Sequence, residues 1–297
     1  MWKISIVINN EQSKLLEEAS FTEAPFLWTQ FYDNESRNSF AIGYFNSKKE
    51  KGEGLKQLNR ILGVAIKTPL TEKIEKEDWQ LSYRKYLKPW HYQTLHWVPE
   101  WMRSDYPKEK DSVVVWYDAG MAFGTGSHPT TQLCGQRLVG FYQYTTKIRR
   151  IEPLTVMDAG CGSGILAISA YALGFSNVTG FDIDKESVRI SEENMERNGF
   201  TRKSVPFFQA DLRIGLENQK RDLIMANIRT PLLKEVAKNL ISALNPGGFL
   251  VLSGILTTEL ESLQQVFYHV ASQEEQTIEC DHRTLQEWSD CQIRLIR

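Results

Sequence analysis

From residue 154 onward, short apolar segments alternate with segments of helical periodicity, and this alternation is the strongest constraint on the fold. Predicted strands lie at 154–157, 178–182, 205–209, 223–227 and 249–253, and helical patterns at 165–173, 186–198, 232–244 and 259–270 fill the gaps. Strands joined through helices pair in parallel, and the helices cover both faces of the sheet. Two more predicted strands, 276–279 and 292–296, have no helical period between them. We therefore expect an α/β sheet of seven strands, mostly parallel, ending in an antiparallel hairpin at one edge.

The start of the chain predicts a smaller, separate unit, since a chain of 297 residues usually exceeds a single core. Predicted strands at 3–8, 26–32 and 40–45 and predicted helices at 11–19 and 53–62 follow the order β-α-β-β-α, which is typical of a ferredoxin-like fold. The charged stretch T-P-L-T-E-K-I-E-K-E-D at 68–78 indicates a domain boundary. We therefore expect a ferredoxin-like domain at 1–67, a linker and connecting segment at 68–116, and the larger domain at 117–297.

The composition excludes several classes of protein. With 41% hydrophobic and 24% charged residues, the chain has the composition of an ordinary globular protein. Its four cysteines have no metal-ligand spacing, so we predict reduced thiols and no metal site. No segment reaches the roughly 18 apolar residues of a membrane span, and the apolar run at the N-terminus is too short for a signal peptide. We expect a cytoplasmic protein with no membrane partner.

A net charge of -2 does not favour binding to nucleic acid, but one segment holds residue types that such binding uses. Residues 79–116 contain five of the eight tryptophans, mixed with Arg84, Lys85, Lys88 and His91. Aromatic and basic side chains of this kind can stack on bases and bind phosphates. The tryptophans can instead pack the connecting segment onto the larger domain, and we favour this interpretation over direct binding of nucleic acid.

The sequence V-M-D-A-G-C-G-S-G-I-L at 156–166 places Gly160, Gly162 and Gly164 directly after the first predicted strand of the larger domain. In an open parallel sheet this first turn is the usual ligand cradle, because glycines let a ligand lie on the backbone at the start of the helix. The dinucleotide pattern G-x-G-x-x-G/A needs glycine or alanine where this chain has Ile165. The loop predicts a ligand site but not one for NAD, and without further residues it also fits a plain turn.

Two carboxylates beside the loop narrow the choice of ligand. Asp182 ends the second strand of this domain, where an acid can accept hydrogen bonds from both hydroxyls of a ribose. Asp158, at the end of the first strand, can face the ammonium group of an amino acid. A ribose site joined to an amino-acid site, with no pyrophosphate to bind, describes S-adenosyl-L-methionine, and we predict this cofactor.

Several motifs together resemble those of a known enzyme family. They are D-A-G-M-A-F-G-T-G-S-H-P-T-T (118–131), V-M-D-A-G-C-G-S-G-I-L-A-I (156–168), G-F-D-I-D (180–184), D-L-I-M-A-N-I (222–228) and L-S-G-I-L (252–256). They look like the successive motifs of the bacterial methyltransferases of large-subunit ribosomal protein eleven. The match is dense from about residue 79 onward, and F-G-T-G-x-H-x-T-T is its most specific part.

The resemblance implies a class I methyltransferase domain with a seven-stranded Rossmann-like sheet and an antiparallel terminal strand. It also implies that the small N-terminal domain recognises the substrate protein. The residues that it implies in contact with S-adenosylmethionine are Thr131, Gly160, Asp182 and Asn227.

The resemblance further implies that the loop of Phe123, Gly124, Thr125 and Gly126 closes over the methionine end of the cofactor. Its two glycines flank the threonine as the hinges of a lid would, ahead of a helix that a proline opens. The following S-H-P-T-T fits simple helix capping equally well, and His128 gives no evidence for a catalytic base.

The expected reaction is an in-line displacement, which needs a lone-pair donor held against the methyl carbon in the absence of water. The accepting amine must be neutral; an α-amine has a pKa of about 7.7–8 and a lysine of about 10.4. Asn227 ends the fourth strand, where its amide oxygen can accept a hydrogen bond from the amine, and we predict it as the catalytic residue. It could instead cap the turn before Pro231. Asp211, after the third strand, can approach the adenine amino group or only cap a helix.

The chain departs from the family pattern after A-N-I, where the family usually continues L-A and this chain has Arg229-Thr230-Pro231. The added cation beside the acceptor pocket bears on which protein is methylated. We expect an N-methyltransferase that acts on lysine side chains or the N-terminal amine of a large-subunit ribosomal protein. The alternatives are methylation of another protein's lysines or of a small amine and, from a different class, an RNA-binding module. A nicotinamide dehydrogenase is disfavoured by Ile165.

Overall fold

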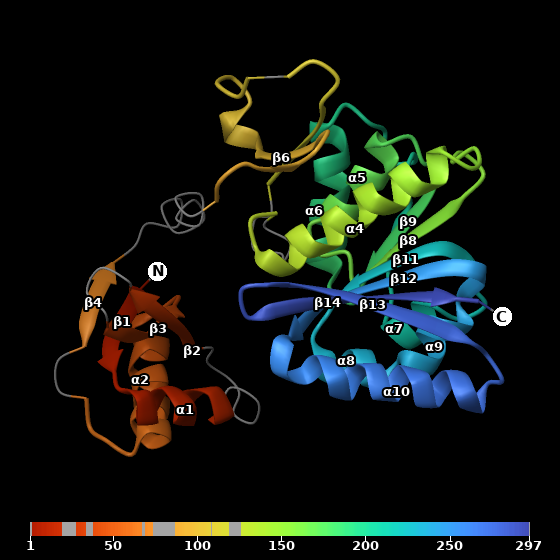
Figure 1. Cartoon of the computed structure of the whole chain (residues 1–297). Coiled ribbons are helices and arrows are strands. Elements are labelled where there is room, and N and C mark those ends of the chain that lie inside the picture. Colours follow the sequence, from red (N-terminus) through yellow and green to blue (C-terminus); the bar gives the residue numbers. More distant parts are fainter. Residues whose placement is uncertain are drawn as a thin grey trace. The chain divides into compact units, whose positions relative to one another are not determined.

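The computed structural model describes residues 2–19, 28–33, 38–66, 69–73, 87–107, 109–118 and 126–296. The chain folds into two compact units, Met1–Lys85 and Tyr86–Arg297 (Figure 1). The expected small N-terminal domain and larger α/β domain are therefore both present. The finer limits at residues 67 and 116 stay predictions.

The first unit is a four-stranded antiparallel sheet with two helices. Its elements are β1 (Trp2–Ile8), α1 (Asn10–Ala19), β2 (Trp28–Asp33), β3 (Asn38–Phe45), α2 (Lys48–Leu62) and β4 (Leu70–Lys73). The strand order β2-β3-β1-β4, with every pair antiparallel, is that of the ferredoxin-like fold. Helix α2 begins before its predicted start because the Ser47 hydroxyl accepts a hydrogen bond from Glu50 N at 3.1 Å and so caps it.

The second unit contains the expected seven-stranded sheet. Its strands are β8 (Thr155–Ala159), β9 (Asn177–Asp182), β10 (Phe207–Gln209), β11 (Arg221–Asn227), β12 (Leu244–Leu256), β13 (Ile278–Leu285) and β14 (Trp288–Leu295). The order is β10-β9-β8-β11-β12-β14-β13, and the first five strands run in parallel. Strand β14 is antiparallel to both neighbours. The order steps outward from β8 in both directions, so the crevice at its carboxyl end is the expected place for a ligand.

Helices cover both faces of this sheet (Figure 1). On one face lie α4 (Pro129–Thr146), α5 (Ile165–Ala172) and α6 (Lys185–Arg197); on the other lie α8 (Thr230–Glu235), α9 (Ala237–Ser242) and α10 (Leu260–Gln273). A short helix, α7 (Leu212–Gly215), follows β10. The prediction of one helix over 232–244 was wrong. The helix is interrupted at Val236, between α8 and α9, and Leu244 already belongs to β12.

A buried ion pair fixes α4 against the antiparallel strand. The guanidinium of Arg137 donates to both carboxylate oxygens of Asp290 on β14, at 2.9 and 2.7 Å, and to Asp281 on β13 at 2.6 Å. Arg137 is 2% exposed and Asp290 is fully buried. Bidentate pairing satisfies both charges in this dry setting. The middle of α4 is thereby held against β13 and β14.

The connecting segment forms a small three-stranded sheet of β5 (Trp90–Tyr92), β6 (Leu95–Pro99) and β7 (Val113–Tyr117). Trp97 is fully buried and its indole N–H donates to the Ser169 hydroxyl of α5 at 2.7 Å. Trp116 is 5% exposed. For these two tryptophans the packing interpretation is confirmed, whereas Trp79 lies outside the described residues.

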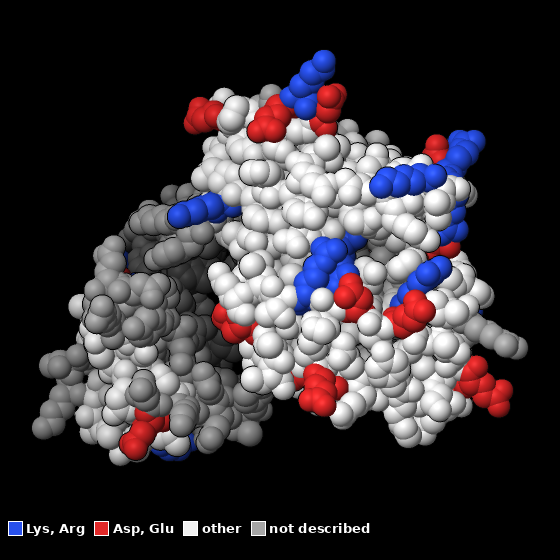
Figure 2. Space-filling view, viewed as in Figure 1, with Lys and Arg blue, Asp and Glu red and all other residues white. Residues whose placement is uncertain are grey.

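Figure 2 shows acidic and basic side chains in small mixed groups on the visible face of the larger unit. The four cysteines are free thiols. No helix among the described residues has the length and apolar character of a membrane span.

Candidate active site

A cavity of about 470 Å³ opens at the carboxyl ends of the parallel strands. Four strand ends supply most of its lining: Gly160 and Gly162 after β8, 181–183 at β9, 210–212 after β10 and 227–229 at β11. The other lining residues are His128, Thr130, Ser187, Leu232, Gly254 and Trp288. The volume lies in the range of small-molecule sites, and the position is the one expected for a ligand of such a sheet.

The glycine loop forms one side of the cavity. Gly160, Gly162 and Gly164 have φ angles of 75°, 53° and 76°, in the left-handed region that favours glycine. Gly164 is the N-cap residue of α5, and Gly162 N donates to Asp182 Oδ2 at 2.9 Å. The three glycines therefore make a tight turn whose backbone is attached to the neighbouring strand end.

Asp182 lines the cavity at the end of β9. Besides its bond to Gly162, its Oδ1 accepts a hydrogen bond from Asp184 N at 2.9 Å. A carboxylate has about four acceptor sites, so both oxygens keep acceptor capacity for a ligand. The next side chain, Ile183, is apolar and 66% exposed, and it also lines the cavity. An acid beside an open apolar wall fits a ribose carrying a flat base.

Asp158 occupies a different position. It is 1% exposed, and its Oδ2 accepts a hydrogen bond from Ala167 N at 3.0 Å. It is not part of the cavity lining. Burial, followed by the nearby charge of Asp182, raises the pKa of the Asp158 carboxyl to about 7. Its predicted contact with the ammonium group of the ligand stays a prediction.

Asn227 lines the cavity at the end of β11, the strand that pairs with β8. Its Nδ2 donates to the Thr131 hydroxyl of α4 at 3.2 Å, and its Oδ1 is buried without a hydrogen-bond partner. The alternative that Asn227 caps the turn before Pro231 is wrong, because the N-cap residue of α8 is Arg229. Thr131 is 1% exposed and holds Asn227 without lining the cavity itself. A buried polar atom without a partner calls for an explanation, and a donor group on a ligand is one explanation that fits a residue lining a cavity.

His128 is the N-cap residue of α4. Its Nδ1 lies 2.7 Å from the Thr130 hydroxyl and 3.4 Å from Thr130 N, which donates to it. The ring meets Trp288 edge to face at 5.3 Å. Burial lowers the pKa of His128, which favours the neutral imidazole. The helix-capping interpretation of S-H-P-T-T is confirmed.

The loop ahead of α4 is described only at its end. Phe123, Gly124 and Thr125 lie outside the described residues, so their predicted role as a lid stays a prediction. Gly126 has a φ of 71°, and a Cβ at this position would lie 3.0 Å from the Tyr117 hydroxyl. Close packing against Tyr117 therefore accounts for glycine here.

Asp211 both caps a helix and lines the cavity. Its Oδ1 accepts a hydrogen bond from Arg213 N at 2.9 Å and so caps α7. It also lines the cavity between Ala210 and Leu212. Capping is confirmed, and a contact with the adenine amino group stays a prediction.

Sequence reasoning missed the apolar part of the cavity. Ile183, Ile228, Leu232 and Trp288 come from four separate segments, and no spacing links them. A usable signal was the apolar residue that directly follows Asp182 and the one that follows Asn227, because residues after strand ends face the crevice. Gly254 was quoted only as part of a motif, yet its φ of 83° and its approach to Ile228 shape the acceptor side.

Comparisons with known proteins agree over nearly the whole chain. A family model described as Ribosomal protein L11 methyltransferase (PrmA) matches residues 4–295. A protein of Photorhabdus laumondii named ribosomal protein L11 methyltransferase is 36% identical over 229 residues, which are 76% of this chain and 72% of the relative. One of the same name from Pseudomonas putida is 31% identical over 280 residues, 89% of this chain and 91% of the relative.

A solved structure is similar as well. The crystal structure of ribosomal protein L11 methylase from Lactobacillus delbrueckii subsp. bulgaricus has a TM-score of 0.57 and 33% sequence identity. The similarity covers 68% of this chain and 95% of that chain.

Proposed function

Because the chain belongs to the ribosomal protein L11 methyltransferase family, we propose that it transfers methyl groups from S-adenosyl-L-methionine to amino groups of ribosomal protein L11. The amines are lysine side chains, the N-terminal α-amine, or both. The observation that carries this proposal is Asn227, whose side chain lines the same cavity as the glycine loop and Asp182 and whose buried Oδ1 has no hydrogen-bond partner.

The residues around the cavity fit the cofactor. Asp182 would accept the two ribose hydroxyls, and the adenine would lie between Ile183 and Leu212 with Asp211 near its amino group. The glycine loop would lie under the amino-acid part, with the Asp158 carboxyl beneath it. A ribose acid, an apolar slot and a glycine turn on adjacent strands are the parts that this cofactor needs.

The bound cofactor supplies a methyl group on a positively charged sulfur, so no covalent intermediate with the protein is required. Asn227 Oδ1 accepts an N–H of the incoming amine and directs the nitrogen lone pair at the methyl carbon. The bond from Asn227 Nδ2 to Thr131 fixes the amide, so that its oxygen is the atom presented to the amine. Thr131 thus orients the catalytic group.

The same cavity favours the reactive form of the amine. An ammonium ion has no lone pair, and moving it among apolar side chains such as Ile228, Leu232 and Trp288 lowers its pKa. Arg229, which also lines the cavity, adds a positive charge that acts in the same direction. His128 contacts Thr130 as the N-cap residue of α4, and the proposed mechanism gives it no role as a base.

The first unit would recognise the protein substrate, and the reaction would take place in the cytoplasm, where ribosomal proteins are made. The divergent sequence of this unit, together with Arg229-Thr230-Pro231, makes the substrate the point to test. Methyl groups labelled in the cofactor should appear in purified L11 and not in a panel of other ribosomal proteins. Labelling of another panel member with L11 unlabelled would replace L11 as the substrate, whereas no labelling of any protein would refute the proposal.

The Asn227→Ala variant tests the mechanism in the same assay. We expect kcat to fall about a hundredfold while affinity for the cofactor stays within a few-fold, because the lost contact is with the amine. A kcat equal to that of the wild-type protein would exclude the role given to Asn227.

A further inference from the structure

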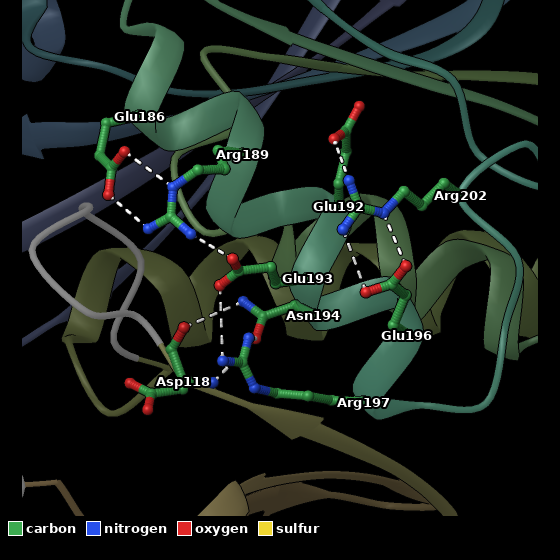
Figure 3. Close-up of polar contacts among 9 residues, drawn as sticks. All are labelled: Asp118, Glu186, Arg189, Glu192, Glu193, Asn194, Glu196, Arg197 and Arg202. Atoms are coloured by element: carbon green, nitrogen blue, oxygen red, sulfur yellow. Dashed lines mark hydrogen bonds and ion pairs between the residues drawn. The ribbon is translucent and has the colours of Figure 1, made fainter.

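Helix α6 presents polar side chains to its buried face, where apolar ones are the rule. Asn194 is fully buried on this face, outside the cavity lining. Its Oδ1 accepts a hydrogen bond from Asp118 N at 2.9 Å, and its Nδ2 donates to Asp118 O at 3.1 Å and to Ser163 O at 2.8 Å. Figure 3 shows Asn194 directed from α6 toward Asp118. One amide thus joins the residue after β7 to the glycine loop.

A second asparagine, one helical turn later, makes the same kind of contact with β7. Asn198 Oδ1 accepts a hydrogen bond from Trp116 N at 2.8 Å, and its Nδ2 donates to Trp116 O at 2.7 Å. Four residues of helix rise about 6 Å, and two residues of strand span about 6.6 Å. The spacing of the two amides therefore matches the spacing of the alternate residues Trp116 and Asp118. Each amide bonds to the backbone N–H and C=O of one of these residues, as the backbone of a neighbouring strand would.

The two asparagines differ in one respect. Asn194 also holds the carbonyl of Ser163, which lies between Gly162 and Gly164, whereas the second donor bond of Asn198 goes to Asn194 O within α6. Ser191, one turn earlier, donates to Gly162 O at 3.0 Å. The glycine loop is therefore held from α6 at two successive carbonyls, and Asn194 also bonds to the segment at Asp118.

The surroundings of Asn194 hold the amide in one orientation. Arg197 Nη1 donates to Asn194 Oδ1 at 3.0 Å, and Glu193 lies 3.6 Å from the same guanidinium (Figure 3). The amide oxygen has two donors and the amide nitrogen has two acceptors, so a flipped side chain would lose all four contacts. This arrangement fixes the side chain before any ligand arrives.

We propose that Asn194 is a positioning residue for the cofactor, which sets the glycine loop in its binding conformation by tying Ser163 to Asp118. The proposal rests on the proposed function only in taking the glycine loop as the floor of the cofactor site. A preformed loop spares the ligand the free energy of ordering it. Loss of the tie would therefore weaken cofactor binding although Asn194 touches no ligand.

The test compares Asn194→Ala with Asn198→Ala, its matched control at the C-cap of the same helix. In Asn194→Ala we expect the KM for S-adenosylmethionine and the Kd for S-adenosylhomocysteine to rise about tenfold. The kcat at saturating cofactor should stay within about twofold of wild type. Asn198→Ala should lose thermal stability to a similar extent but keep both constants. Amide hydrogen exchange over 160–164 should be faster in Asn194→Ala alone.

The outcomes separate this proposal from the proposed function. Absence of S-adenosylhomocysteine binding in the wild-type protein would overturn both, whereas equal Kd values for the two variants would overturn only the role of Asn194. A lower kcat with an unchanged KM would also overturn it, because that pattern reports fewer folded molecules. If Asn194→Ala does not fold, Asn194→Ser is measured, since its hydroxyl can still donate to one carbonyl. If neither variant folds, Asn194 is needed for folding itself, and its role as a positioning residue for the glycine loop is overturned.

Discussion

At the scale of single residues, two of the oxygen-bearing side chains that line the cavity differ in their hydrogen bonds. Asp182 already accepts backbone N–H groups on both oxygens, whereas Asn227 Oδ1 accepts none. The first therefore helps to build the site, and in our proposal it also binds the cofactor. The second gains a partner, in our proposal, when the amine arrives.

Asp182→Ala should lose affinity for the cofactor. The variant removes the proposed acceptor of the ribose hydroxyls and also the bond to Gly162 N, so we expect the Kd for S-adenosylmethionine to rise by about a hundredfold in calorimetry. Asp184→Ala is the control, because Asp184 caps α6 by accepting from Glu186 N and does not line the cavity. That variant should lose about 1 kcal/mol of stability and keep its affinity. Equal affinities for the two variants would remove the ribose assignment.

The buried Asp158 should make stability depend on pH. Its pKa is about 7 in the folded protein, compared with 3.8 for a solvated aspartate. Between these values the unfolded chain has lost a proton that the folded protein keeps, so the free energy of unfolding falls as the pH rises from about 4 to about 7 and then levels off. Asp158→Asn cannot titrate but can still accept from Ala167 N. Relative to wild type, this variant should therefore gain stability across this pH window in urea unfolding. If the free energies of unfolding of the two proteins change in parallel with pH, the raised pKa of Asp158 would be contradicted.

At the scale of elements, the turn after β11 is packed against a bulge in β12. The register of β12 with β14 shifts between Leu252 and Ile255, and Gly254 in this bulge has a φ of 83°. A Cβ on Gly254 would lie 2.7 Å from Ile228 O. Backbone meets backbone here, so neither side can yield easily.

Gly254→Ala should consequently destabilise the larger unit by about 2 kcal/mol or more, through a positive φ and a backbone clash together. Gly247→Ala is the matched control, because Gly247 has a φ of 78° and a Cβ there would meet no atom within 4 Å. It should cost only the strain of the positive φ, about 1 kcal/mol. Thermal unfolding measures both, and equal losses would show that the clash is relieved.

The elements themselves could be predicted to the extent that their cause is local. The runs that become β9 and β11 each end at a polar residue, so their ends were visible in the sequence at Asp182 and Asn227, whereas β8 continues one residue past Asp158 to Ala159. The interruption of the helix at Val236 was not visible in the sequence, because the residues around it keep a helical pattern. The packing of the two short helices α8 and α9 determines where the interruption falls.

The site was predictable on the same terms. Residues at strand ends could be placed together because parallel strands finish at one edge. The role of the polar face of α6 could not be predicted from the sequence. The contacts of Asn194 are with Ser163 in the glycine loop and with Asp118 after β7, and both lie far from it in the sequence. Trp288 reaches the cavity through the antiparallel insertion of β14, which no local pattern specifies.

At the scale of the whole molecule, each unit has its own apolar core. Ile4, Phe45 and Leu58 are buried in the first unit, and Ile224, Phe267 and Ile293 in the second. All described residues that line the cavity belong to the second. Binding of the cofactor and recognition of the protein substrate should therefore be separable.

A chain of residues 86–297 should bind S-adenosylmethionine with a Kd within about threefold of the full protein, because its cavity is unchanged. It should not methylate L11 at a measurable rate, since the proposed recognition unit is absent. Calorimetry and labelled methyl transfer give the two results. A truncated chain that methylates L11 as the full protein does would show that the first unit has another role.

The two asparagines of α6 have one more consequence for the molecule. Strand β7 is the last strand of its small sheet, and its outward backbone groups at Trp116 are occupied by the Asn198 amide, with those of Asp118 beyond it occupied by Asn194. A bare strand edge recruits strands from other molecules and promotes aggregation. Because the two amides occupy the backbone N–H and C=O groups of Trp116 and Asp118, these groups are not open to pairing with a strand of another molecule.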